Sequence, residues 1–280
     1  MNTSSHIYQY KSWLRHRVLT LFAVLCMLCA ASTGWAREGV EVGDNSAFSK
    51  LVPAEQVEQS AAQQYGQMLE QAESKGVLLG KNDPQVKRLQ AMARKMIPFA
   101  YEWNPRAPNW KWEVNLIDSG QINAFCMPGG KIAFYTGLVQ KLKLTDDEVA
   151  MVMGHEIAHA LREHARERMG KNAATGMGAN LLSQVLGFGQ VGQTVTSYGA
   201  QLLTLKFGRE DESEADLVGM DLAARAGYDP RAGVSLWRKM SAANQSAPPQ
   251  WLSTHPSGKT RITDIEANLP KVLPLYERGK

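Results

Sequence analysis

Two histidines separated by three residues are the part of this sequence best suited to chemistry. His155 and His159 enclose Glu156 in the pentapeptide HEIAH. Upstream, residues 145–148 have the pattern of a capping box, which predicts a helix that can run without a breaker to about residue 169. Residues four apart share one face of a helix, so both imidazoles can reach one metal ion. The intervening Glu can then act as a base on the water that such an ion activates.

A catalytic zinc ion needs a third protein ligand and an open position for water. His164 is the nearest candidate, but on a continuous helix it points about 140° away from His159, so we expect it at the surface. The acidic run 210–216 supplies an alternative. Glu212 and Asp216 are spaced i, i+4 and share one face, so Glu212 can bind the ion while Asp216 supports it or handles protons.

The other acids of that run have a simpler interpretation. Glu214 is about 200° from Glu212 on a helix and faces away from it. We expect Glu214 and Asp211 to be solvated acids near a helix N-terminus, where the helix dipole favours negative charge.

The elements around these motifs can be predicted by their breakers and periodicity. Helices are expected over 53–75, 83–99, 145–169, 210–226, 229–243 and from about 257, and strands over 110–117, 121–127 and 131–135. Residues 172–205 carry no charge. We interpret them as one or two helices packed on the core, or as a lid with some membrane contact.

The two motifs together resemble the gluzincin metallopeptidases of the HtpX-like and BepA/LoiP-like family, whose second motif is ExxxD. The resemblance spans roughly residues 80–270. It includes the segments 123–125, 129–130, 227–230 and 253–256. It implies one zinc ion per chain with the ligands His155, His159 and Glu212. It also implies Glu156 as the catalytic base and Asp216 as an auxiliary catalytic acid.

The resemblance further implies a zincin-like α+β fold. This fold is mainly helical, with a small mixed β-sheet whose edge strand lies beside the HExxH helix. Family enzymes bind substrate as an added strand at that edge, for which Asn123, Ala124 and Phe125 are the candidates. His255, in a His-Pro loop, could approach the zinc ion. There it could hold the enzyme latent or stabilise the oxyanion. A third alternative is that His255 only forms part of a turn, and the sequence leaves all three open.

The N-terminus has the layout of a secretory signal peptide. A basic stretch, 11–17, precedes the apolar run 18–31, and small residues at 34 and 36 suit cleavage. An uncleaved signal that anchors the chain in the membrane is the alternative. The whole chain of 280 residues has a net charge of +4, and the first 36 residues hold three of its basic groups and no acid. The remaining chain is nearly neutral, which argues against a nucleic-acid partner.

These observations predict four parts: a signal peptide over 1–36, a linker and helix over 37–80, a zinc metallopeptidase domain over 81–270, and a C-terminal tail over 271–280. The resemblance favours the secreted branch of the family. It implies a periplasmic metalloendopeptidase, peripheral to the outer membrane, that acts on unfolded or misassembled envelope proteins in quality control. The alternative is a periplasmic chaperone or assembly factor with a latent or structural zinc site. The oligomeric state does not follow from the sequence.

Overall fold

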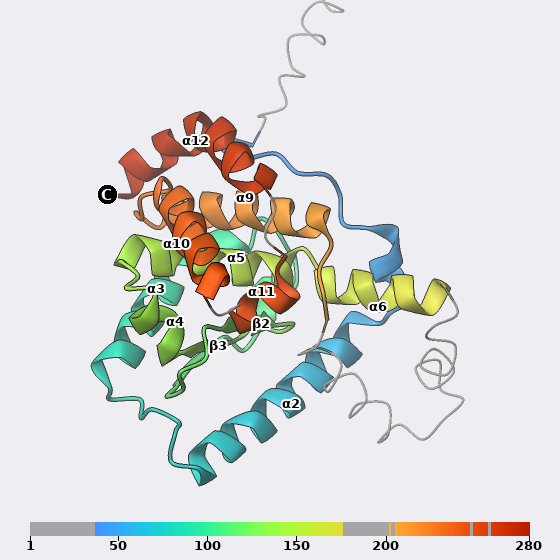
Figure 1. Ribbon diagram of the computed structural model, residues 1–280. Helices are drawn as coiled ribbons and strands as arrows, with labels where there is room; N and C mark the ends of the chain where they lie inside the picture. The colour runs from blue at the N-terminus through green and yellow to red at the C-terminus, as the bar shows by residue number, and fades with distance from the viewer. Residues whose placement is uncertain (1–36, 176–201, 203–204, 247–248, 257–258) are drawn as a thin grey trace, which may run out of the picture. The chain divides into compact units, whose positions relative to one another are not determined.

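The computed structural model describes residues 37–175, 202, 205–246, 249–256 and 259–280. The chain divides into two compact units, Met1–Glu38 and Gly39–Lys280, and the fold described here is that of the second (Figure 1). Its described elements are η1 Ala47–Leu51, α2 Ala54–Ser74, α3 Pro84–Ala100, η2 Ala107–Asn109, β1 Glu113–Ile117, β2 Ala124–Met127, β3 Lys131–Tyr135, α4 Thr136–Lys141, α5 Asp146–Leu161, α6 His164–Ala174, α9 Arg209–Arg225, α10 Ala232–Ser246, α11 Gln250–Thr254 and α12 Lys259–Gly279. The expected signal peptide and most of the uncharged segment lie outside the described residues.

A small mixed sheet has the strand order β1-β3-β2. β1 runs parallel to β3 and β2 runs antiparallel to it, with Phe125 opposite Ala133. The turn from β2 to β3 requires glycine, because Gly129 and Gly130 both have positive φ angles, and a Cβ on Gly130 would lie 2.6 Å from the Trp112 ring. The predicted combination of many helices with a small mixed sheet is confirmed, and β2 is an edge strand of that sheet.

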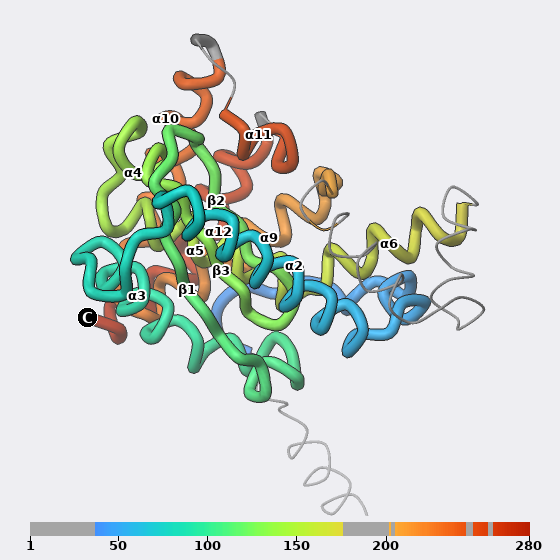
Figure 2. The backbone as a smooth tube through the Cα atoms, turned by 90° about the horizontal axis from the view of Figure 1, so that it is seen from below, coloured from blue at the N-terminus to red at the C-terminus, as the bar shows by residue number. Residues whose placement is uncertain are grey.

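The two faces of the sheet are covered by different helices. Ile132 and Phe134 of β3 belong to the main core with α3, α5 and α9. Ala133 faces the other way and packs against Ala61 and Tyr65 of α2. The Tyr65 hydroxyl donates a hydrogen bond to the Ile132 carbonyl at 2.5 Å. α2 is therefore fixed to the outer face of the sheet, and Figure 2 shows it alongside the strands.

The centre of the fold is the packing of α5 against α9, with α12 on the outer side of α9 and α10 against α5 (Figure 1). Buried aliphatic side chains from both helices fill the contact, among them Val152 and Leu222. Gly154 and Gly219 face each other where the two backbones approach most closely. The expected ligands and the candidate base lie on these two helices: His155, Glu156 and His159 on α5, and Glu212 with Asp216 on α9.

Several elements differ from the sequence-based expectations. The predicted helix 145–169 is broken after α5, because Glu163 adopts a left-handed conformation with φ 60°, and α6 starts at His164. The expected tail 271–280 is instead the end of α12, where Val272 and Leu275 are buried. Part of the loop expected after α10 forms the short helix α11. Among the described residues, no helix has both the length and the apolar character needed to cross a membrane.

Candidate metal centre

α5 carries the HEIAH segment into the interior of the protein. Thr145 caps the helix, with its hydroxyl accepting from the Glu148 backbone N–H and the Glu148 carboxylate accepting from the Thr145 backbone N–H. This capping box fixes the start of the helix, as predicted. Ten residues further on, His155, Glu156 and His159 are all buried. The imidazoles of His155 and His159 lie on one face, with their Nε2 atoms 3.0 Å apart.

α9 brings a carboxylate to these two imidazoles from the other side of the helix contact. Glu212 is fully buried, and its oxygens lie 3.6 Å from His155 Nε2 and 3.5 Å from His159 Nε2. Asp216, one turn further along α9, accepts a hydrogen bond from His155 Nδ1 at 3.0 Å. The expectation that Glu212 and Asp216 share one face towards the histidines agrees with this geometry.

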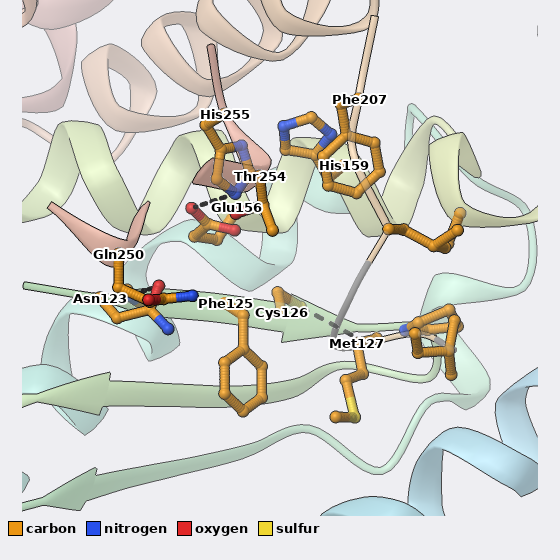
Figure 3. A pocket seen from close by; sticks show the side chains of 15 residues that line it. Asn123, Phe125, Cys126, Met127, Glu156, His159, Phe207, Gln250, Thr254 and His255 are labelled. Atoms are coloured by element: carbon orange, nitrogen blue, oxygen red, sulfur yellow. Dashed lines mark hydrogen bonds and ion pairs between the residues drawn. The ribbon is translucent and has the colours of Figure 1, made fainter. Parts of the chain in front are cut away.

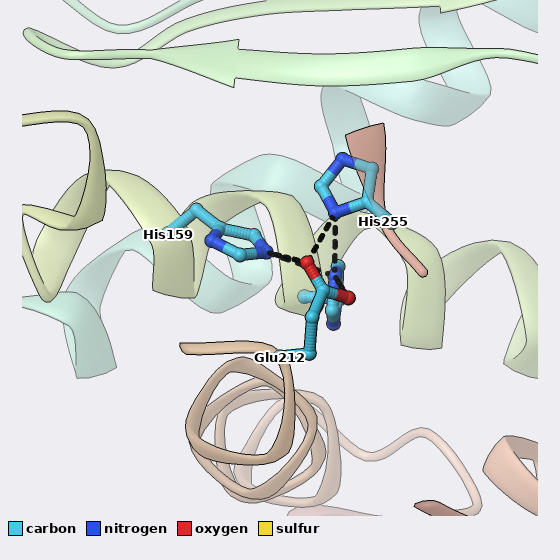
Figure 4. A group of neighbouring side chains, drawn as sticks. His159, Glu212 and His255 are labelled. Atoms are coloured by element: carbon cyan, nitrogen blue, oxygen red, sulfur yellow. Dashed lines mark hydrogen bonds and ion pairs between the residues drawn. The ribbon is translucent and has the colours of Figure 1, made fainter. Parts of the chain in front are cut away.

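His255 lies directly after α11 and closes the group. Its Nδ1 is 3.0 Å from Glu212 Oε1 and 3.3 Å from His155 Nε2. Its ring stacks on the indole of Trp251. Figure 4 shows His159, Glu212 and His255 converging from three different elements. The sequence placed His255 in a loop of unknown direction, and the structure places it in the centre.

The four groups suit a tetrahedral metal ion. One ligand atom from each of His155, His159, Glu212 and His255 lies within 4.8 Å of the others. In a tetrahedral zinc site with metal–ligand distances near 2.1 Å, the ligand atoms are about 3.4 Å apart. The separations given above run from 3.0 to 3.6 Å. The donor set of imidazole nitrogens and one carboxylate is also the set that zinc prefers.

The protonation states of His159, Glu212 and Asp216 agree with metal binding. Burial lowers the pKa of His159, and the neighbouring histidines lower it further, so its ring is neutral and has a free lone pair. Burial raises the pKa of Glu212, but the hydrogen bond and charge of His255 outweigh this effect and leave the pKa below its usual value. Burial also disfavours the ionised form of Asp216, yet Arg261 and His155 lower its pKa to about 2. Both carboxylates are therefore ionised at neutral pH. Burial lowers the pKa of His255, but Glu156 and Glu212 outweigh this effect and leave it above its usual value, so a metal ion would have to displace its second proton.

Two residues of the site have no counterpart in the sequence analysis. Arg261 of α12 is buried, and its guanidinium donates to both oxygens of Asp216 and to Glu212 Oε2. Trp251 is also buried and donates its Nε1–H to Glu156 Oε1 at 2.5 Å. Their only signal in the sequence was their position near His255. Their direction depends on how α12 packs on α9 and how α11 brings Trp251 to Glu156 of α5.

Asp216 is better explained as a positioning residue than as an acid. Its two oxygens accept hydrogen bonds from Arg261 and His155. A carboxylate with a pKa of about 2 has no proton to give at neutral pH. In contact with His155 Nδ1, it keeps the His155 proton on that nitrogen and leaves Nε2 free for a metal ion. We therefore propose this role for Asp216 in place of the auxiliary acid expected from the resemblance.

A pocket opens between the metal-binding group and the edge strand β2. Its wall includes residues 123–128, Glu156, His159, Phe207 and His255. In Figure 3, Glu156 and His255 lie above the strand, whereas Phe125 points away from them. Asn123, Ala124 and Phe125 thus line the same pocket as Glu156, and their role in binding a substrate strand stays a prediction.

Two sequence-based expectations about this region were wrong. His164 is not at the surface but almost completely buried, and its Nδ1 lies 2.8 Å from His159 Nδ1. Glu214 is not a free acid, because it pairs with His164 and Arg162. Asp211 is also buried, and it accepts the Gly208 backbone N–H that precedes α9.

Comparison with known proteins agrees with this geometry. The model of a family described as peptidase family M48 matches residues 83–269, two thirds of the chain. The chain belongs to peptidase family M48. The match contains α5, α9 and the loop that carries His255, so the metal centre lies within it. The chain therefore carries a zinc metallopeptidase domain, and the prediction of a zinc cofactor is confirmed.

Individual relatives have two kinds of name. The chain is 41% identical over 150 residues to "Mitochondrial metalloendopeptidase OMA1" of Arabidopsis thaliana, covering 54% of this chain and 30% of that protein. It is 36% identical over 164 residues to the OMA1 protein of Schizosaccharomyces pombe, covering 58% and 48%. It is 30% identical over 170 residues to the "Beta-barrel assembly-enhancing protease" of Escherichia coli O157:H7, covering 57% and 35%. The chain thus covers less than half the length of each, and the comparisons support family M48 without selecting the branch expected from the sequence.

Proposed function

We propose that this M48 chain is a zinc metalloendopeptidase that hydrolyses peptide bonds in unfolded or misassembled proteins of the cell envelope. The observation that carries the proposal is the position of Glu156. It lies between a four-ligand metal centre and the pocket along an edge strand. A metal site with a structural role alone does not need a buried carboxylate that faces a pocket beside an edge strand.

The chemistry divides between the ion and the chain. A zinc ion held by the cluster would supply Lewis-acid chemistry, polarising the scissile carbonyl and making a water molecule acidic. Glu156 would accept the proton of the attacking water and pass it to the leaving amine. Trp251 holds the Glu156 carboxylate through Oε1, which fixes the direction of the base. Asp216 and Arg261 keep His155 and Glu212 in place.

The expected substrate is an extended backbone rather than a particular side-chain sequence. In the described part of the fold, β2 pairs with β3 on one side, and the pocket follows β2 and the residue on each side of it, 123–128. A substrate strand added there would gain backbone hydrogen bonds that are independent of its side chains. Such binding suits chains that have lost their fold, because these expose extended backbone. This argument supports misfolded proteins as substrates.

We further propose that the arrangement with His255 in the ligand set is a latent state of the enzyme. His255 Nδ1 occupies the fourth corner of the ligand set, which a catalytic site keeps open for water. His255 Nε2 also lies 3.6 Å from Glu156 Oε1. Movement of the His255 side chain away from the cluster would free the ion and the base together, while Trp251 keeps its hydrogen bond to Glu156. This role for His255 is the inhibitory one of the two left open by the sequence.

Cleavage of an unfolded porin by the zinc-loaded chain tests the function. Glu156→Gln keeps the shape of the base and removes its basicity, so we expect it to retain zinc and lose cleavage. His255→Ala should retain zinc on three ligands and cleave faster than the wild type. Ser253→Ala, an exposed change in the same short helix, is the matched control and should leave both properties unchanged.

The alternative is a chaperone or assembly factor in which the zinc site has no turnover. The closed four-ligand arrangement is the observation that favours it, because structural zinc sites are closed. A zinc-loaded His255→Ala variant that binds unfolded porin but does not cleave it would establish the alternative. If the Glu156→Gln variant cleaves at the wild-type rate, Glu156 is not the base and the proposed mechanism is refuted.

The proposed compartment is the periplasm, where the protein could also attach to the outer membrane. The alternative is that an uncleaved signal anchors the chain in the membrane. The basic stretch 11–17 and the apolar run 18–31 support export. The E. coli relative named "Beta-barrel assembly-enhancing protease" is consistent with substrates in the envelope. N-terminal sequencing of the chain recovered from a periplasmic fraction tests the proposal. A first residue of Arg37 is the expected result, and an intact Met1 would favour the anchor.

A further inference from the structure

The outer nitrogen of His159 has an unusual partner, the ring of a third histidine. His159 Nδ1 lies 2.8 Å from His164 Nδ1, and both rings are buried. A continuous helix would keep these residues apart. The break between α5 and α6 at Glu163, with φ 60°, turns the chain so that the first residue of α6 returns to His159.

The other side of the His164 ring meets a carboxylate from α9. His164 Nε2 lies 3.3 Å from Glu214 Oε2, and Arg162 donates its Nε–H to Glu214 Oε1. The Glu214 carboxylate thus offers one oxygen to each partner.

The positions of the protons follow from this chain of contacts. If His159 offers its Nε2 lone pair to a metal ion, its ring proton must lie on Nδ1. Two ring nitrogens 2.8 Å apart share one hydrogen, so His164 Nδ1 must accept it. The N–H of the His164 ring is then on Nε2, which faces Glu214 Oε2. Glu214 therefore selects the tautomer of His164, and His164 selects that of His159.

We propose that His164 and Glu214 are positioning residues that form a hydrogen-bond relay and present the Nε2 lone pair of His159 to the metal ion. The relay is the counterpart of Asp216, which holds the outer nitrogen of His155 directly. Outer partners of this kind raise metal affinity, and their loss typically weakens it 10–100-fold. The inference rests on the metal centre of the proposed function, but it concerns residues that bind neither zinc nor substrate.

The test compares the zinc dissociation constants of purified full chains by competition with a chromogenic chelator. His164→Asn keeps an acceptor close to the position of Nδ1, whereas His164→Leu has a similar volume and no acceptor. We expect His164→Leu to weaken zinc binding about 10–100-fold, and His164→Asn to recover most of that loss. Equal losses in the two variants, or none in His164→Leu, would overturn the relay.

Glu214→Gln provides a second test on a partly exposed side chain that should tolerate the change. Arg162 would hold the amide oxygen, so the amide NH₂ would face His164 Nε2 and favour the wrong tautomer. We expect zinc affinity to fall about 10-fold. Glu210→Gln is the matched control, because it removes the same negative charge from an exposed position on the same helix. It should leave zinc affinity unchanged. Equal zinc affinity in these two variants would also overturn the relay.

The thermal unfolding of each metal-free variant separates positioning from folding. The relay predicts weaker zinc binding by Glu214→Gln and His164→Leu in chains that still unfold cooperatively near the wild-type temperature. A loss of zinc binding that simply follows a loss of apo-protein stability would refute it. A wild-type chain without zinc affinity would instead refute the proposed function, so the two failures are distinct.

Discussion

Replacing Gly219 by alanine should damage the metal centre without touching any of its side chains. Gly219 of α9 packs on α5 beside His155, and a Cβ added there would lie 2.5 Å from the His155 backbone nitrogen and 2.6 Å from the Gly154 carbonyl carbon. These neighbours are backbone atoms of a buried helix, so they cannot rotate away. The two helices must therefore separate locally to accept the methyl group.

The size of the effect follows from the contact distances. Ordinary contacts of a Cβ begin at 3.4 Å, so the added methyl group must open the contact by about 1 Å, at a cost of roughly 1–3 kcal/mol of overpacking. The ligand separations that cross this contact are 3.6 Å from His155 to Glu212 and 3.5 Å from His159 to Glu212. Metal sites tolerate deviations of about 0.2 Å. If most of that strain falls on the bound state, zinc binding should weaken about 5–100-fold, because about 1.4 kcal/mol is a factor of ten.

Zinc affinity and apo-protein stability must both be measured, because alanine also favours the helix. The gain in helix propensity is about 1 kcal/mol, so the free energy of unfolding of the metal-free variant should change little. Gly66→Ala in α2 is the matched control, since nothing lies within 4 Å of its added Cβ. It should be slightly more stable than the wild type, with an unchanged zinc dissociation constant. A Gly219→Ala chain that binds zinc as tightly as the wild type would refute the argument that backbone contact positions the ligands.

Two further predictions concern residues around the site. Burial raises the pKa of the Glu148 carboxyl group, but its hydrogen bonds, led by the one from Lys239, outweigh burial and leave the pKa below its usual value of 4.5. The ionised carboxylate therefore stabilises the fold fully above pH 4.5. This stabilisation is lost as the pH falls through the folded-state pKa. Glu148→Gln should therefore lower the free energy of unfolding in urea by about 1 kcal/mol at pH 7, and an equal deficit well below pH 4.5 would contradict this assignment. Arg261→Lys should weaken zinc binding about 10-fold in a chelator competition, because one ammonium group cannot contact Asp216 and Glu212 as the planar guanidinium does. Unchanged zinc affinity would show that Arg261 only fills space.

The elements of the metal centre could be predicted where the signal was local. The capping box at Thr145 located the start of α5, and Asp83 located that of α3, because each cap satisfies backbone groups within one turn. The i, i+4 spacing of Glu212 and Asp216 gave their common face for the same reason. The end of α5 could not be predicted, since no proline or glycine marks it. Glu163 adopts its left-handed conformation while paired with Arg106 and Arg166, and Arg106 is 57 residues away in the chain.

The sequence by itself determined the chemical groups of this protein, since two histidines, a base and an acidic motif at helical spacing leave few alternatives to a zinc peptidase. It could not determine which distant groups would meet them. Arg261 reaches the site because α12 packs on α9, and Trp251 reaches it because α11 brings its indole to Glu156 of α5. His164 reaches it because the helix breaks after α5. The spacing of residues along one helix is set by its backbone geometry. Contacts between helices depend on packing such as the Gly154–Gly219 approach, which only the assembled tertiary structure defines.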